Sequence, residues 1–123
     1  MMQYLMVAVG GALGAVARYA GYRVALRLEW HAALATLGIN VLGSLLIGMM
    51  YVVVTERSGL SPNTQSLVTI GFLGAFTTYS TYSLDALKLL EQGQIVLALG
   101  YLLGTLLLCL LAVWLGAMLV RLV

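Results

Sequence analysis

The chain has 123 residues, of which 63% are apolar and only 8% are charged, and its formal net charge is +2. A soluble domain is about one-quarter charged, so this composition excludes a soluble globular domain, and the small net charge gives no indication of nucleic-acid binding. What remains is an all-α integral membrane protein in the lipid bilayer, with room for four transmembrane helices at about 20 to 25 residues per span.

Four apolar segments follow one another without a soluble linker, so we predict a single transmembrane domain over residues 1–123. An even number of spans places both chain ends on the same side of the membrane. Ser61 and Pro62 have the pattern of an N-cap followed by proline at the first helical position, which indicates where the third span begins. The spans are expected at about 3–27, 32–55, 62–92 and 94–122, with a polar loop at 56–61.

The first segment carries small residues at helical spacing. Gly10, Gly14 and Arg18 are four residues apart, and Gly100 and Gly104 form a similar pair in the last segment. Such pairs allow helix backbones to approach closely in lipid, so both predict helix packing. Arg18 lies well inside the first span, where it is either an anchor that reaches the interface or a buried cation that attracts anions.

The second segment has a polar face inside the membrane. Thr36, Asn40 and Ser44 are four residues apart and therefore lie on one side of the helix. The Asn40 amide must be hydrogen-bonded in hydrocarbon, because an unpaired amide there costs several kcal/mol. It either bonds another helix, which contributes about 0.6 to 2 kcal/mol, or donates into an ion path. The sequence leaves both interpretations open.

The third segment contains seven consecutive hydroxyl-bearing residues at positions 77–83, preceded by Gly71 and Gly74. Serine and threonine compete with the helix for backbone hydrogen bonds, and one helix over 62–92 would exceed a bilayer core of about 30 Å. We therefore predict that the third helix is broken near 76–80, at mid-membrane. A break leaves free N–H groups at one helix end and free carbonyls at the other, which suit an anion and a cation. The alternative is a tilted, unbroken helix.

The remaining polar residues exclude several functions. Tyr101 and Thr105 share a face of the last span, where they either extend a polar track or bond a neighbouring backbone. The lone Cys109 rules out a disulfide within the chain. No Cys/His cluster, phosphate-binding loop or nucleophile–base pair is present, so the chain is not expected to be an enzyme. The first, second and fourth segments contain no Asp or Glu, and Asp85 lies near the end of the third segment, whereas a proton antiporter needs a carboxylate in its path.

Three sequence motifs occur in order along the chain: GGALGAVARY at 10–19, GINVLGS at 38–44 and GFLGAFTTYSTYS at 71–83. Together they resemble the Fluc (CrcB) family of small bacterial fluoride channels, and the likeness covers all four spans. The resemblance implies a dual-topology homodimer, in which two antiparallel subunits form two pores for passive fluoride efflux across the bacterial inner membrane. It implies no soluble protein partner.

The resemblance also implies roles for individual residues. One sodium ion is expected at the centre of the dimer interface, held by the backbone carbonyls of Gly74 and Thr77. Arg18 is implied to be a structural and vestibule residue. The fluoride pathway is implied to include the pore asparagine and a set of hydroxyl-bearing residues: Asn40, Ser44, Ser80, Thr81, Tyr101 and Thr105.

One difference from the family is chemically important. The family usually has two phenylalanines in the third motif, whose ring edges face fluoride, and this chain has Tyr79 and Tyr82 there. A phenol keeps the electropositive ring edge, but its hydroxyl can donate to an anion, occlude the path or bond elsewhere. Two alternatives to a fluoride channel therefore remain: a membrane subunit that does not transport or works only in a heterodimer, and a small multidrug-type proton antiporter.

Overall fold

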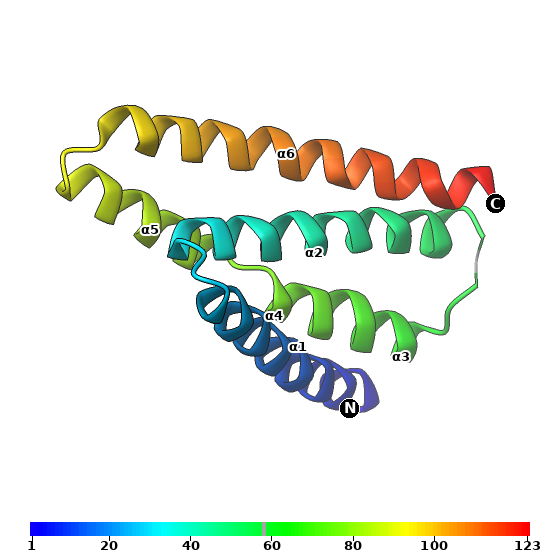
Figure 1. Cartoon of the computed structure of the whole chain (residues 1–123). Helices are drawn as coiled ribbons and strands as arrows, with labels where there is room; N and C mark the ends of the chain where they lie inside the picture. The colour runs from blue at the N-terminus through cyan, green and yellow to red at the C-terminus, as the bar shows by residue number, and fades with distance from the viewer. Residues whose placement is uncertain (58) are drawn as a thin grey trace.

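The computed structural model of the chain describes residues 1–57 and 59–123, and these fold into four antiparallel helical segments (Figure 1). The all-helical fold is the one that the composition predicts. The first, second and fourth segments are single helices: α1 (Met2–Arg27), α2 (Ala32–Thr55) and α6 (Ile95–Leu122). Each of these is long and apolar enough to cross a membrane. Position 58, within the predicted loop 56–61, lies outside the described residues.

The third segment is divided into two parts. The first part runs through α3 (Pro62–Gln65), the π-helix η1 (Ser66–Leu73) and α4 (Gly74–Phe76), and the second part is α5 (Tyr79–Glu91). Figure 1 shows the chain leaving the helix between α4 and α5 and resuming beside α6. Neither part has the roughly 20 residues that a helix needs to cross a bilayer alone, so only the two parts together are long enough for the predicted third span.

Local sequence explains where two of these segments begin. The Ser61 hydroxyl accepts a hydrogen bond from the Thr64 amide at 3.2 Å, and Pro62 occupies the first helical position. At the start of α2, the imidazole of His31 accepts a hydrogen bond from the Ala33 amide at 3.3 Å. Both side chains satisfy amides that have no partner within their own helix.

Glycines set the closest helix contacts. On α1, a Cβ added at Gly10 or Gly14 would overlap the backbone carbonyls of Leu67 or Phe72 in η1. This is the close packing that the spacing of Gly10 and Gly14 predicts. The α2–α6 pair is equally close, because an added Cβ at Gly48 would overlap the Val113 carbonyl and one at Gly116 would overlap the Leu45 carbonyl.

The same interpretation fails for the second glycine pair. An added Cβ at Gly100 or Gly104 would meet no atom of the described chain within 4 Å, apart from the helix's own neighbouring backbone. The prediction that this pair mediates helix packing is therefore wrong within a single chain. Residue spacing identifies a shared helix face, but the partner opposite that face is set by the tertiary fold.

Replacing Gly116 and Gly104 by alanine should therefore have opposite effects on stability. Alanine favours a helix by about 1 kcal/mol over glycine, so Gly104→Ala should raise the melting temperature slightly. Gly116→Ala should lower it, because overpacking against the Leu45 carbonyl costs about 1–3 kcal/mol. Thermal unfolding of the purified chains in one detergent measures both variants. Equal melting temperatures would contradict the close α2–α6 contact.

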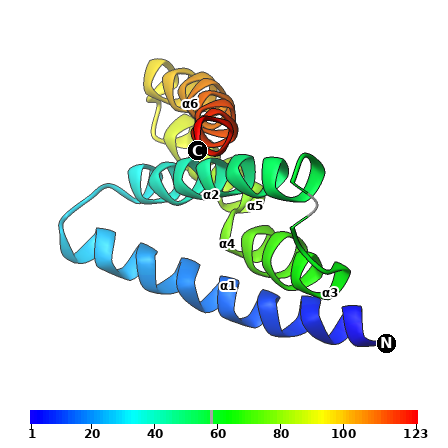
Figure 2. The same ribbon diagram turned by 90° about the vertical axis from the view of Figure 1, so that its right-hand side faces the viewer.

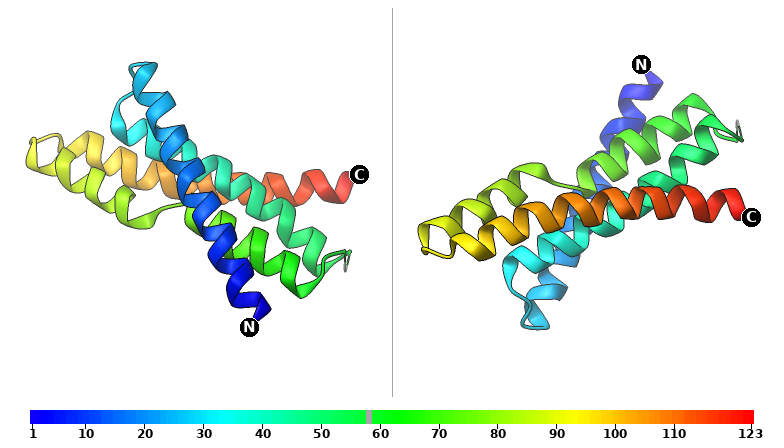
Figure 3. Two further views of the ribbon diagram at one scale, coloured as in Figure 1. Left: turned by 90° about the horizontal axis from the view of Figure 1, so that it is seen from below. Right: turned by 90° about the horizontal axis from the view of Figure 1, so that it is seen from above.

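Both chain ends lie at one end of the bundle, near the connection between α2 and α3, on the same side as each other (Figures 1 and 2). There, the Arg121 guanidinium binds the Glu56 carboxylate through two nitrogens, and Arg57 donates to the Val120 carbonyl. The hydrogen bond from Arg121 lowers the pKa of the Glu56 carboxyl below its usual value. Figure 3 shows α1 crossing the other helices obliquely instead of running along them.

Candidate functional site

The break in the third segment places two helix ends opposite each other. The backbone is extended at Thr77 (ψ 158°) and at Thr78 (φ −150°, ψ 121°). The Thr78 hydroxyl caps α5 by accepting a hydrogen bond from the Thr81 amide at 3.2 Å. The carbonyl end of α4 and the amide end of α5 are thus separated by two residues.

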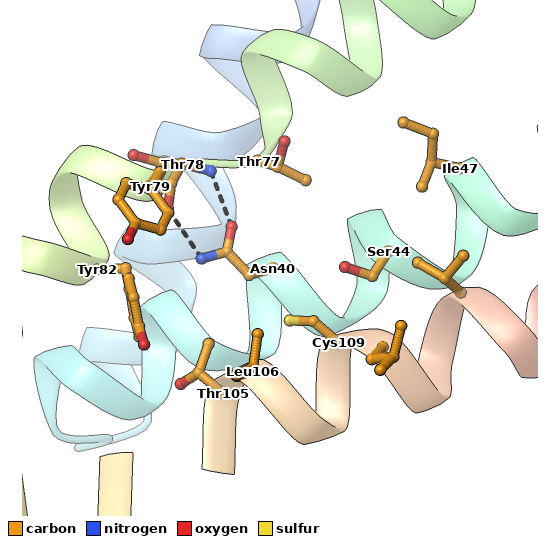
Figure 4. A pocket seen from close by; sticks show the side chains of 12 residues that line it. Asn40, Ser44, Ile47, Thr77, Thr78, Tyr79, Tyr82, Thr105, Leu106 and Cys109 are labelled. Carbon is orange, nitrogen blue, oxygen red and sulfur yellow. Dashed lines mark hydrogen bonds between the residues drawn. The ribbon is translucent and has the colours of Figure 1, made fainter. Parts of the chain in front are cut away.

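Asn40 of α2 holds this break through both atoms of its amide (Figure 4). Its Nδ2 donates to the Thr78 carbonyl at 2.9 Å, and its Oδ1 accepts from the Thr78 amide at 2.8 Å. In an uninterrupted helix, the Thr78 amide would bond the Gly74 carbonyl. The bonds to Asn40 therefore leave the Gly74 carbonyl without its helical partner, and a second N–H on Nδ2 is available for another acceptor.

Gly43, almost one turn after Asn40, brings α2 close to the break. A Cβ at this position would overlap the Thr77 methyl group and lie 3.3 Å from the Phe76 ring. The Thr77 hydroxyl is itself fixed, since it donates to the Leu73 carbonyl at 3.0 Å. A side chain at Gly43 would therefore push the extended backbone away from Asn40.

A cavity of about 580 Å³ lies between α2, the break and α6, and it is open on one side (Figure 4). Polar groups enter it from three helical segments, among otherwise apolar walls. The Thr105 hydroxyl is buried and has no hydrogen-bond partner among the described residues. The lining consists of Asn40, Ser44, Ile47, Thr77, Thr78, Tyr79, Tyr82, Thr105, Leu106, Cys109, Leu110 and Val113.

Three tyrosines form a continuous aromatic contact from the break to α6. The ring centroids of Tyr79 and Tyr82 are 5.5 Å apart, and those of Tyr82 and Tyr101 are 5.3 Å apart. The Tyr82 hydroxyl donates to the Leu102 carbonyl at 2.8 Å, so it is already used within the chain. The Tyr79 side chain is 80% exposed, whereas Tyr101 is buried and its hydroxyl has no hydrogen-bond partner in the described part of the chain.

The structure brings together some of the residues that the sequence singles out and separates others. Arg18 is partly exposed on α1 and does not border the cavity, and Gly74 is exposed at the start of α4. The cavity is bordered by Asn40, Ser44, Tyr79, Tyr82 and Thr105, and also by Thr77, but not by Ser80, Thr81 or Tyr101. Ser80 and Thr81 instead lie 3.4 and 3.1 Å from the Thr78 hydroxyl, measured between side-chain oxygens.

Sequence reasoning missed one buried polar pair. The Thr36 hydroxyl donates to the Asp85 carboxylate at 2.6 Å, and Asp85 is only 3% exposed. Lys88 on the same helix lies 3.9 Å from the other carboxylate oxygen and is itself exposed. Thr36 stood out as part of the polar face of α2, but nothing in the sequence pairs it with a residue 49 positions later. This pair fixes α5 against α2 beyond the break.

Oxygen atoms are the available cation ligands near the break. Among residues 1–57 and 59–123, no group of three or more His, Cys, Asp or Glu side chains could hold a metal ion. The carbonyl of Gly74, which loses its helical partner to the Asn40 contact, and the carbonyls at the end of α4 suit a hard monovalent cation instead.

Comparison with known proteins gives a consistent result. Residues 5–117 match the family model described as "CrcB-like protein, Camphor Resistance (CrcB)". A protein of Stutzerimonas stutzeri named fluoride-specific ion channel FluC is 46% identical over 118 residues, covering 94% of each chain. Proteins of the same name from Saccharophagus degradans and Magnetococcus marinus are 42% and 43% identical, covering 92% and 99% of this chain and 85% and 100% of their own lengths.

Proposed function

The chain belongs to the CrcB family, and from this premise we propose that it is a fluoride-specific ion channel that lets fluoride leave the cell passively. It is a multi-pass membrane protein, and its activity is conduction, not an enzymatic reaction. Its relatives carry the name fluoride-specific ion channel over nearly their full lengths. The observation in this structure that supports the proposal most is a cavity beside a broken helix, into which a few polar groups project among apolar walls.

Fluoride is small and strongly hydrated, so a selective path must replace its water shell with donors. The cavity offers the unused N–H of Asn40 and the hydroxyl of Ser44, and Thr105 also lines it. The electropositive ring edges of Tyr79 and Tyr82 add favourable contacts for an anion. We place these five residues in the central part of the path.

The ends of the path are proposed from residues beyond the cavity. Tyr101, whose buried hydroxyl has no hydrogen-bond partner among the described residues, packs on Tyr82, so it continues the aromatic side of the path. Ser80 and Thr81, in the first turn of α5, continue the hydroxyl side. Arg18 contributes positive charge that attracts anions to a vestibule.

A second, antiparallel copy is proposed to complete the pathway. One chain leaves the cavity open on one side, and a dry membrane interior requires an ion path to be enclosed by protein. A homodimer would close two such cavities, one on each subunit. The two ends of the bundle differ little in their number of Lys and Arg residues, so the chain carries no strong orientation signal. Insertion of the two copies in opposite orientations agrees with this.

A structural sodium ion at the dimer centre is also proposed. The carbonyl end of a half-helix attracts a cation, and the Gly74 carbonyl is freed by the Asn40 contact. The Gly74 and Thr77 carbonyls of one chain would supply two ligands, and the same atoms of a second copy would supply two more. Sodium bound there would offset the negative ends of both α4 helices.

The purified chain should be tested in liposomes loaded with potassium fluoride, with a fluoride-selective electrode outside. Passive efflux should begin only when a potassium ionophore removes the opposing potential, whereas a multidrug-type proton antiporter should release no fluoride with or without the ionophore. Vesicles loaded with potassium chloride, followed with a chloride electrode, test selectivity. A well-folded chain that is silent alone but active with a second chain of its family would support the heterodimer alternative instead.

Removing the ring of Tyr82 should matter more than removing its hydroxyl. Tyr82→Phe loses a hydrogen bond to Leu102, which is expected to cost about 1 kcal/mol of stability, and efflux should stay within about threefold. Tyr82→Leu also removes the ring edge and should slow efflux about tenfold or more. The liposome assay compares both variants at equal protein density. Equal losses would show that the phenol itself donates to fluoride.

A further inference from the structure

The last turns of α1 carry a stripe of one tyrosine and two arginines. Tyr19, Arg23 and Arg27 are four residues apart, so they lie on one face of the helix, and all three are exposed. Figure 3 shows this end of α1 and its connection to α2 protruding from the rest of the bundle. Trp30, in that connection, is 52% exposed. Exposed aromatic and basic side chains together are typical of the depth at which lipid headgroups lie.

The two guanidinium groups of this stripe are free to bind an anion. Among the described residues, neither Arg23 nor Arg27 forms an ion pair with a carboxylate. Arg23 donates one N–H to the Tyr19 hydroxyl at 3.2 Å, and its guanidinium carbon lies 5.9 Å from the centre of the Tyr19 ring. Because a guanidinium has five N–H donors, this contact orients Arg23 and leaves most of its donors unused.

The arginines at the opposite end of the bundle differ in this respect. Arg121 binds the Glu56 carboxylate through two nitrogens, and Arg57 donates to the Val120 carbonyl. Both guanidinium groups there are thus held by groups of the same chain. The contrast indicates that the stripe at the end of α1 binds an anion from outside the chain.

A second copy of the chain does not supply that anion. The chain has four acidic residues, of which Asp85 is buried and Glu56 is bound by Arg121. In the antiparallel dimer proposed above, the partner presents its opposite end, where Glu56 lies, beside the α1 stripe. The other two acidic residues, Glu29 and Glu91, follow α1 and end α5, so the partner carries them on the far side of the membrane. The anions that remain at this depth are those of acidic lipids.

We propose that Arg23 and Arg27 bind the phosphate group of an acidic phospholipid at the membrane surface. Four residues span about 6 Å of helix, so the two long side chains can reach one headgroup together. The planar guanidinium matches two phosphate oxygens at once, which favours arginine over lysine for this contact. The Tyr19 ring lies one turn deeper on the same face, where the lipid becomes apolar. This site is separate from the ion path and does not depend on fluoride conduction.

The experiment counts bound lipid by native mass spectrometry of the full chain in detergent. Phosphatidylglycerol, which is anionic, and phosphatidylcholine, which has no net charge, are added in equal amounts. The parent chain should bind phosphatidylglycerol preferentially. The double variant Arg23→Gln, Arg27→Gln should lower this preference at least about tenfold, because one arginine near an anionic surface strengthens binding about fivefold. Arg57→Gln removes one positive charge at the opposite end and is the matched control, which should keep the preference.

Several outcomes would overturn the proposal. The parent chain would have no such site if it bound both lipids equally. A preference that survives in the double variant, or that Arg57→Gln also abolishes, would place the effect elsewhere or in net charge alone. Inorganic phosphate that displaces the lipid at equal concentration would indicate a site for free anions instead of a lipid surface.

A second measurement applies if the double variant does not fold, as its melting temperature without lipid would show. The preference of the parent chain for phosphatidylglycerol should then be measured at rising salt concentration. At about 1 M salt, charges are screened beyond about 3 Å, so the preference should largely disappear. A preference that is unchanged at this salt concentration would contradict binding through the two exposed arginines.

Discussion

Fluoride efflux should be lost when Asn40 is replaced by alanine. The substitution removes the donor that faces the cavity, and it also leaves the Thr78 amide and carbonyl without their partners. Thr78 is only 8% exposed, so each unpaired backbone group costs about 1–3 kcal/mol. The variant should therefore be both inactive and less stable, as measured by liposome efflux and by thermal unfolding in detergent.

Asn40→Asp keeps one of the two bonds to the break and places a negative charge in the path. A carboxylate can still accept from the Thr78 amide, but it cannot donate to the Thr78 carbonyl and it carries charge that repels anions in the path. This variant should also stop efflux. Ser44→Ala, one turn along the same face, is the matched control, because Ser44 borders the cavity but does not bond the break in the described structure; its efflux should fall by less. Full efflux in either Asn40 variant would remove Asn40 from the pathway.

The sequence predicts much of the architecture but not what positions the break. Composition and span length are sufficient for four membrane helices, and the hydroxyl run indicates weak helix formation. Within that run of seven residues, Thr77 and Thr78 have extended backbone in the structure, whereas residues 79–83 begin α5. The Ser83 hydroxyl bonds the Tyr79 carbonyl one turn back, as serine does within helices. The contact that holds Thr78 comes from Asn40, 38 positions earlier, and no local pattern specifies it.

The candidate site shows the same limit. The polar face of α2 left open whether Asn40 bonds another segment or donates into an ion path; in the structure its amide bonds Thr78 in the break, because a buried amide needs partners. The sequence could not show that both amide atoms bind one residue, nor that Thr36 pairs with Asp85. Cys109 carried no signal of its own as a lone thiol in an apolar run, and only the fold places it at the wall of the cavity.

Gly43→Ala should reduce fluoride efflux at least about tenfold, although it adds only one methyl group. That methyl would overlap the Thr77 methyl and crowd the Phe76 ring. Thr77 cannot turn aside without losing its bond to Leu73, since threonine is stiff about its first side-chain torsion. The extended backbone must therefore move, which displaces Thr78 from Asn40 and shifts the Thr77 carbonyl proposed for sodium.

The matched control for Gly43→Ala is Gly38→Ala on the same helix. There, the added Cβ would lie 3.7 Å from the Trp30 ring, an ordinary van der Waals distance, so efflux should be largely retained. Both variants are compared with the parent chain at equal protein density in the liposome assay. Unchanged efflux in Gly43→Ala would mean that the break tolerates displacement, and the position of the Thr78 backbone would then not control conduction. If efflux is lost in Gly43→Ala and retained in Gly38→Ala, conduction depends on the close approach of α2 to the break, which keeps Thr78 bonded to Asn40.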